Sequence, residues 1–199
     1  MAYYATLAAH GLIEPSALDV YLRDGTTLWG HVTRTLAHEV IDASTGSLGH
    51  GLGLALGYAQ AYRLRGVQGR VFCVLSDGEL NEGSIWEAAL YAGAGNFDRL
   101  VVIVDYNKIQ SLERVSAVME LEPLAEKWRA FRWEVREAPG HDVDALRAAL
   151  ERPNIQKPLL VLAHTVKGKG LPHIEDTVDS HYKPATESDV ELLSKACHA

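Results

Sequence analysis

The sequence contains few cysteines, no excess of positive charge and no long apolar run. Its two cysteines, Cys73 and Cys197, lie far apart, and no basic stretch leads into an apolar segment at the start, which points to a reducing cytoplasm. A net charge of −7 would repel a phosphate backbone, so we expect no nucleic-acid partner. Apolar runs such as 158–163 are far shorter than the roughly 20 residues that cross a bilayer, so we expect no membrane partner.

The chain does have enough apolar residues to form a packed core. Its 199 residues are 47% hydrophobic, which suits a folded domain and excludes a disordered chain. Helix and strand patterns alternate along it, and this favours an α/β fold with a doubly wound, mainly parallel sheet and helices on both faces. Because no repeat, low-complexity segment or linker interrupts the pattern, residues 1–199 are predicted to form a single domain.

Two β-branched apolar runs, 70–75 and 100–105, have the length and composition of strands covered on both faces. The segment 83–95 between them predicts a crossover helix and therefore a right-handed βαβ unit. A run rich in Gly, Ala and Leu at 47–64 predicts a long helix that is closely packed and buried. The remaining predicted helices span 3–10, 16–23, 122–131, 142–151 and 188–196, and the remaining predicted strands span 133–136 and 159–164.

Polar residues follow the first two predicted strands. In an open parallel sheet, ligands collect beyond the carboxyl ends of the strands, which here carry Asp77 and Asn107. These side chains and the backbone carbonyl of Ile109 offer an incomplete oxygen shell, which suits Mg²⁺ holding a diphosphate. Gly78 would allow a close backbone approach. Because Asp-Gly is also a common turn, a purely structural role for this pair remains open.

The residues around these strand ends resemble the thiamine-diphosphate-binding motif of transketolases. The motif covers 76–88 and 104–110, with Ser76 in place of the family's usual first glycine. Other sequence blocks also match, in the order in which the family has them and over nearly the whole chain. These blocks are 43–51, 123–128, 140–142, 165–170 and His181. Several blocks in one order are more specific than any single block.

The resemblance implies a role for each matching residue. It implies that a divalent cation, Mg²⁺ or alternatively Ca²⁺ or Mn²⁺, is held by Asp77, Asn107 and the carbonyl of Ile109. It implies that thiamine diphosphate is bound by Gly46, Ser47, Leu48, Asp77, Gly78, Asn107, Lys167 and His181. The catalytic residues that it implies, at the substrate channel or at an interface between protomers, are His31, His181, Glu82 and Glu87.

Each of these assignments has a simpler structural alternative. The loop Gly46–Leu48 could only cap a helix, and His31, which is followed by Val32 rather than the family's proline, could be an ordinary loop residue. Lys167 could lie on a solvated surface loop. The carboxylates of Glu82 and Glu87 could only be acids favoured by a helix dipole.

The resemblance covers only one half of a transketolase. The pyrimidine-binding half, which supplies the glutamate that activates the coenzyme, is expected on a separate chain, as in split transketolases that assemble as heterotetramers. The expected activity is the transfer of a two-carbon ketol unit from a ketose phosphate to an aldose phosphate through a carbanion adduct of the coenzyme. The family's N-terminal segment with Ser-Lys-Gly-His has no counterpart, so the chain is expected to be short at that end or to work without it.

Two other functions remain open. The first component of a 2-oxoacid dehydrogenase uses the same coenzyme, although the blocks at 82–88 and 165–170 fit transketolase better. The chain could also be a catalytically idle binding or scaffolding module. Cofactor binding and the choice between sugar phosphates and pyruvate discriminate between these functions.

Overall fold

The computed structural model describes residues 1–35, 39–151 and 156–197. Its internal contacts divide the chain into two compact units, residues 1–48 and residues 49–199. Each unit has its own buried apolar cluster.

The first unit contains α1 (Ala2–Ala9) and the 3₁₀-helix η1 (Pro15–Val20). Its buried apolar side chains are Tyr4, Leu7, Leu28 and Ile41. The Tyr4 hydroxyl donates a hydrogen bond to the Trp29 carbonyl at 3.1 Å, which connects α1 to the segment after η1. The helix predicted at 16–23 is thus a shorter 3₁₀-helix that begins at a proline, a residue whose fixed φ suits a first helical position.

The second unit is built on a four-stranded sheet in which all strands are parallel. The strands are β1 (Val71–Ser76), β2 (Leu100–Tyr106), β3 (Glu134–Pro139) and β4 (Leu159–His164), and their order is β1-β2-β4-β3. The predicted α/β fold with a parallel sheet is confirmed. Because parallel strands end at one edge, the segments that follow β1 and β2 leave the sheet side by side, with Ser76 paired to Asp105.

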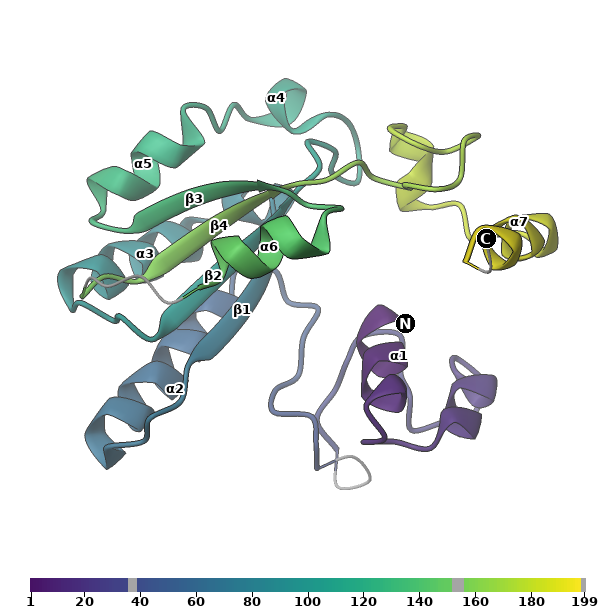
Figure 1. Cartoon of the computed structure of the whole chain (residues 1–199), viewed down its shortest axis with the longest axis horizontal. Helices are drawn as coiled ribbons and strands as arrows, with labels where there is room; N and C mark the ends of the chain where they lie inside the picture. The colour runs from purple at the N-terminus through teal and green to yellow at the C-terminus, as the bar shows by residue number, and fades with distance from the viewer. Residues whose placement is uncertain (36–38, 152–155, 198–199) are drawn as a thin grey trace. The chain divides into compact units, whose positions relative to one another are not determined.

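Helices cover both faces of this sheet (Figure 1). Alternate residues of β2 belong to different cores: Val102 and Val104 pack in the larger cluster with α2 and α3, while Val101 packs in the smaller cluster with Ala149 of α6. The helices of this unit are α2 (Gly51–Arg65), α3 (Gly83–Ala94), α4 (Val115–Val118), α5 (Leu124–Ala130), α6 (Val143–Ala149) and α7 (Glu187–Cys197), with 3₁₀-helices η2 (Gly78–Asn81) and η3 (Val178–His181).

The helix predicted at 47–64 differs from the observed α2 in two respects. It begins only at Gly51, because Gly49 has a φ of +85°, which a right-handed helix does not contain. The expected burial of the helix is also wrong for one of its faces, since Leu54 is 47% exposed and Tyr58 is 39% exposed. The short helix α4 was not predicted at all, because four residues carry too little periodicity to be recognised.

Candidate functional site

Asp77 connects the ends of the two central strands. It follows β1 directly, and its N–H donates to the Asp105 carbonyl of β2 at 3.3 Å. One carboxylate oxygen accepts the N–H of Gly78 at 2.7 Å, and the other accepts the N–H of Lys108. With 1% exposure, the Asp77 side chain is buried against the turn that carries Asn107. The structure thus places the Asp77 carboxylate against the backbone of the turn that carries Asn107, as the neighbouring strand ends in the sequence predict.

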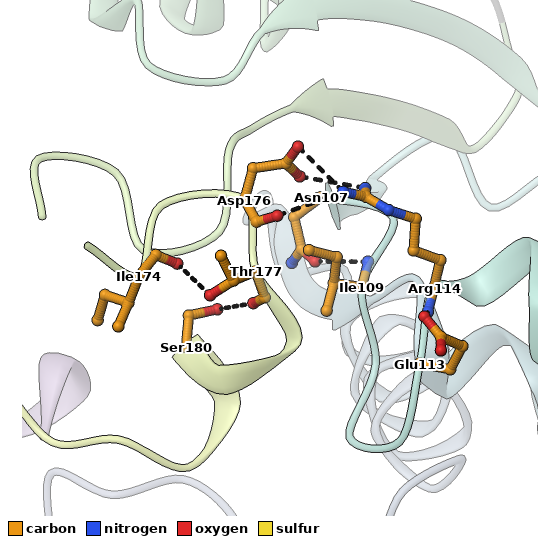
Figure 2. Close-up of polar contacts among 8 residues, drawn as sticks. All are labelled: Asn107, Ile109, Glu113, Arg114, Ile174, Asp176, Thr177 and Ser180. Carbon is orange, nitrogen blue, oxygen red and sulfur yellow. Dashed lines mark hydrogen bonds and ion pairs between the residues drawn. The ribbon is translucent and has the colours of Figure 1, made fainter. Parts of the chain in front are cut away.

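The turn after β2 presents its oxygens on one side. The Asn107 side-chain oxygen accepts the N–H of Ile109 at 3.0 Å (Figure 2). Ile109 also forms an antiparallel bridge with Arg114, in which the residues on either side make the backbone hydrogen bonds. In such a pair, the N–H and C=O of the central residue point away from the partner strand. The Ile109 carbonyl therefore points to the same side as the Asn107 oxygen.

The pKa of the Asp77 carboxylate is set mainly by its burial, which nearby positive charge only partly offsets. Burial raises its pKa above the ordinary value, and the nearby Asp105 raises it further. The N–H groups of Lys108 and Gly78, together with the charge of Lys167, act in the opposite direction. A divalent cation beside this carboxylate would favour its ionised form.

The donor types narrow the kind of cation that this site could hold. In the parts of the chain that the structure describes, no three His, Cys, Asp or Glu side chains are grouped so as to hold a metal ion. A cation at Asp77 would therefore be held by one carboxylate together with amide, carbonyl and external oxygens. This all-oxygen set suits a hard ion such as Mg²⁺, which keeps several ligand positions for phosphate and water. The residues present therefore fit a metal-bound diphosphate.

The segment after β4 is tied to the same turn. The Arg114 guanidinium forms an ion pair at 3.1 Å with the Asp176 carboxylate (Figure 2). The Asp176 N–H donates to the Lys167 carbonyl at 2.9 Å. The Arg114 guanidinium holds the pKa of Asp176 below its usual value. These contacts connect the loop that carries Lys167 and His181 to the residues beside Asn107.

Lys167 acts electrostatically on two of the predicted site residues. Burial lowers the pKa of His181, and the positive charge of Lys167 lowers it further. Lys167 also lowers the pKa of Asp77. Because these effects require proximity, Lys167 lies within electrostatic range of both groups. His181 is therefore favoured in its neutral form, which can both donate and accept a hydrogen bond.

Replacing Lys167 by methionine is expected to raise the pKa of His181 towards, but not above, its ordinary value, because burial remains while the repulsion is lost. The His181 ring signal followed by NMR through a pH titration measures this directly. With Lys167 present, the pKa of His181 is lower in the folded than in the unfolded chain, so the unfolded chain takes up the imidazole proton at a higher pH. The free energy of unfolding therefore falls as pH drops from the ordinary histidine pKa through the lowered one. Lys169→Met, which removes the partner of Glu175 instead, is the matched control, and an equal shift in both variants would refute the role of Lys167.

The remaining predicted residues lie in two places. His31, Gly46, Ser47 and Leu48 belong to the first unit, where a Cβ at Gly46 would lie 2.6 Å from the His31 ring. Gly46 also has a φ of +104°, so a side chain is excluded there by both space and backbone. Ser47 and Leu48 are exposed.

The two predicted interface acids lie on α3 in the second unit. Glu82 precedes its first residue and Glu87 lies within it, and both side chains are at least partly open to solvent. A Cβ at Gly49 would lie 2.8 Å from the Cβ of Glu82, which fixes the backbone of Glu82 beside the start of α2. The Glu82 side chain makes no hydrogen bond that caps α3, so its carboxylate does not serve as the N-cap of this helix.

A buried carboxylate that the sequence analysis missed organises the loop after β1. Glu79 is 8% exposed, and its carboxylate accepts the N–H of Gly49 at 2.8 Å and that of Ser76 at 3.4 Å. In return, the Glu79 N–H donates to the Ser76 hydroxyl at 3.2 Å. This reciprocal pair is a capping box, and the spacing Ser-x-x-Glu at 76–79 was its sequence signal. It also gives Ser76 a structural role where the related motif has glycine.

Comparisons with known proteins identify the family of the chain. Residues 4–198 match the family described as transketolase, thiamine diphosphate binding domain. A 6-deoxy-6-sulfo-D-fructose transketolase subunit of Clostridium sp. (strain MSTE9) is 40% identical over 190 residues, which are 94% of this chain and 68% of that protein. An apulose-4-phosphate transketolase subunit of Actinobacillus succinogenes is 38% identical over 194 residues, with 96% and 69% covered.

A solved structure shows the same fold. The transketolase of Campylobacter jejuni superposes with a TM-score of 0.85 at 26% identity, and the match covers 91% of this chain but only 29% of that one. The chain therefore spans less than a third of that enzyme. Within the described ranges, no helix is long and apolar enough to cross a membrane. The family resemblance is confirmed: the chain belongs to the transketolase family of transferases, as a thiamine-diphosphate-binding domain.

Proposed function

We propose that this chain is the diphosphate-binding subunit of a split transketolase, which moves a two-carbon ketol unit from a ketose phosphate to an aldose phosphate. The observation that carries the proposal is the buried carboxylate of Asp77, hydrogen-bonded to the turn that presents the oxygens of Asn107 and Ile109. In the reaction, the bond between C2 and C3 of the donor breaks and a new carbon–carbon bond forms at the aldehyde carbon of the acceptor.

The metal and the cofactor contacts are part of the proposal. Asp77, Asn107 and the Ile109 carbonyl would hold Mg²⁺, for which Ca²⁺ or Mn²⁺ could substitute. Bound thiamine diphosphate would supply a carbon nucleophile and an electron sink. Lys167 would offset negative charge beside the diphosphate. His181, kept neutral, would hydrogen-bond a substrate hydroxyl and hold or release its proton. In the first unit, His31 would contact the substrate, and Gly46, Ser47 and Leu48 would contact the cofactor.

We also propose that the pyrimidine-binding half resides on a partner chain. Two relatives matched over about two thirds of their length are named as subunits, whereas the Campylobacter jejuni transketolase is more than three times as long as the match. Residues 1–199 would then form a single diphosphate-binding domain. A second chain would supply the glutamate that contacts the coenzyme's pyrimidine ring.

The exposed faces of α2 and α3 support self-association to a heterotetramer. Leu54 and Tyr58 on α2, and Leu90 (55% exposed) and Tyr91 (60% exposed) on α3, leave apolar surface uncovered. A Cβ at Gly57 would meet no atom within 4 Å, so a neighbouring backbone could approach closely there. Because Glu82 and Glu87 also belong to this region, a second copy packed on it would bury them near the site.

An assay of two-carbon transfer tests this function. The chain, purified together with its partner, is expected to convert a ketose phosphate donor and an aldose phosphate acceptor only when Mg²⁺ and thiamine diphosphate are both present. Decarboxylation of pyruvate by the same complex would favour a 2-oxoacid dehydrogenase component instead. A complex that binds neither cofactor nor sugar phosphate would favour the idle module.

A further inference from the structure

An unsatisfied pair of side-chain amides lies between the two segments that carry the proposed metal ligands. Asn81 is the last residue of η2, the short helix that follows Asp77, and Gln110 comes directly after Ile109. The Asn81 amino group donates to the Gln110 side-chain oxygen at 3.4 Å. The pair therefore joins the end of β1 to the turn after β2.

Each amide keeps one buried polar atom without a partner. The Asn81 side-chain oxygen and the Gln110 side-chain nitrogen are both shielded from solvent, and neither makes a hydrogen bond to any described residue. Exchanging oxygen and nitrogen in both amides would reverse the bond between them but would still leave one amino group and one carbonyl free. An unmade buried hydrogen bond is unfavourable, so such groups are expected to have a partner in the functional state.

The position of Gln110 is fixed by its contact with Gly78. A Cβ added to Gly78 would lie 2.8 Å from the Gln110 Cβ and 3.1 Å from its side-chain oxygen, so only glycine leaves room for this side chain. Gly78 itself donates its N–H to the Asp77 carboxylate. The Gln110 side chain is thus held beside the backbone of Gly78, next to the proposed metal ligand Asp77, before any ligand binds.

We propose that the Asn81–Gln110 amide pair binds the metal-bound diphosphate, with its free amino group donating to a non-bridging phosphate oxygen and its free carbonyl accepting from water. This inference rests on the proposed function. A phosphate oxygen is a charged acceptor, and a neutral amide donor satisfies it without adding charge beside Lys167. The pair would therefore position the diphosphate without changing the protonation of the site.

Three variants of the full chain, with its partner present, test the pair by calorimetry. Gln110→Leu removes the donor and is expected to weaken binding of Mg²⁺·thiamine diphosphate, and of Mg²⁺·pyrophosphate as a probe of the diphosphate alone, by about tenfold. Gln110→Glu keeps an oxygen for Asn81 but places an acceptor against the phosphate, and it is expected to weaken binding further. Gln156→Leu makes the same chemical change at an exposed position just before β4. This position lies at the amino-terminal ends of the strands, away from the proposed site at their carboxyl ends, so the variant is expected to bind as the wild type does.

Thermal unfolding of the ligand-free protein supplies the second readout. Gln110→Leu removes one unsatisfied nitrogen but also the acceptor of the Asn81 amino group, so if the pair serves the ligand, the melting temperature of the ligand-free protein changes little while the affinity falls. Binding measured at a temperature where all variants are folded separates affinity from stability. The inference would be overturned if Gln110→Leu bound both ligands as the wild type does, or if Gln110→Glu restored the affinity that Gln110→Leu loses. It would also be overturned if the loss were seen with thiamine diphosphate but not with pyrophosphate. Absence of binding by the wild type would instead overturn the proposed function itself.

Discussion

Asp77→Asn is expected to abolish magnesium-dependent binding of thiamine diphosphate while the chain still folds. The variant removes the one charged oxygen among the proposed ligands but keeps the shape of the side chain and one acceptor for the N–H of Gly78. Loss of a group that only orients a metal ligand already costs about 10–100-fold in affinity, so loss of the charged ligand itself should exceed about 100-fold. Calorimetry with Mg²⁺ and thiamine diphosphate measures the effect.

Asp105→Asn is the matched control for this prediction. Asp105 lies in the neighbouring strand β2, paired with Ser76, but its side chain is exposed and accepts a hydrogen bond from the hydroxyl of Thr165. The same change of charge at this position should therefore alter the affinity only slightly. Circular dichroism of both variants verifies that they fold. Equal affinities in the two variants would show that Asp77 has no special role in binding.

Gly93→Ala is expected to be among the most damaging single substitutions in the second unit. Gly93 is buried in α3, and a Cβ there would lie 1.7 Å from the Phe131 carbonyl oxygen, a backbone atom that cannot rotate away. Relieving this overlap requires α3 to move away from the end of α5. Overpacking of a core usually costs about 1–3 kcal/mol, and we expect at least about 3 kcal/mol here because the obstacle is backbone.

Gly57→Ala gives the comparison, because a Cβ at Gly57 in α2 meets no atom within 4 Å. Alanine is the better helix former, so this variant should be as stable as the wild type or more stable by up to about 1 kcal/mol. Urea unfolding of the two variants measures the difference. A Gly93→Ala protein as stable as Gly57→Ala would mean that α3 does not pack on Phe131 as described.

The sequence predicted the sheet well because its signals are local and repeated. The β-branched runs before Asp77 and Asn107 determine two strands, and the order of helices and strands favours parallel pairing, which brings both residues to one edge. The oxygen types at these positions then suggest a cation. Local pattern and chain order together were therefore enough to identify the main elements of the candidate site.

The contacts that hold the site together were not predictable, because they join residues far apart in the sequence. The ion pair of Arg114 with Asp176 connects loops 62 positions apart, and nothing in either segment signals the other. The overlap that excludes a side chain at Gly93 likewise depends on how α3 and α5 pack. The capping box of Ser76 and Glu79 was visible in the sequence, but the stronger signal of the Asp77–Gly78 dipeptide obscured it.

The most direct test is a crystal structure of the chain with its partner, Mg²⁺ and thiamine diphosphate. We expect one ion with side-chain oxygens of both Asp77 and Asn107, and the carbonyl of Ile109, at about 2.0–2.1 Å, together with phosphate oxygens in the same shell. An ion bound elsewhere, or one that contacts only one of these two side chains while the diphosphate lies apart from them, would contradict it.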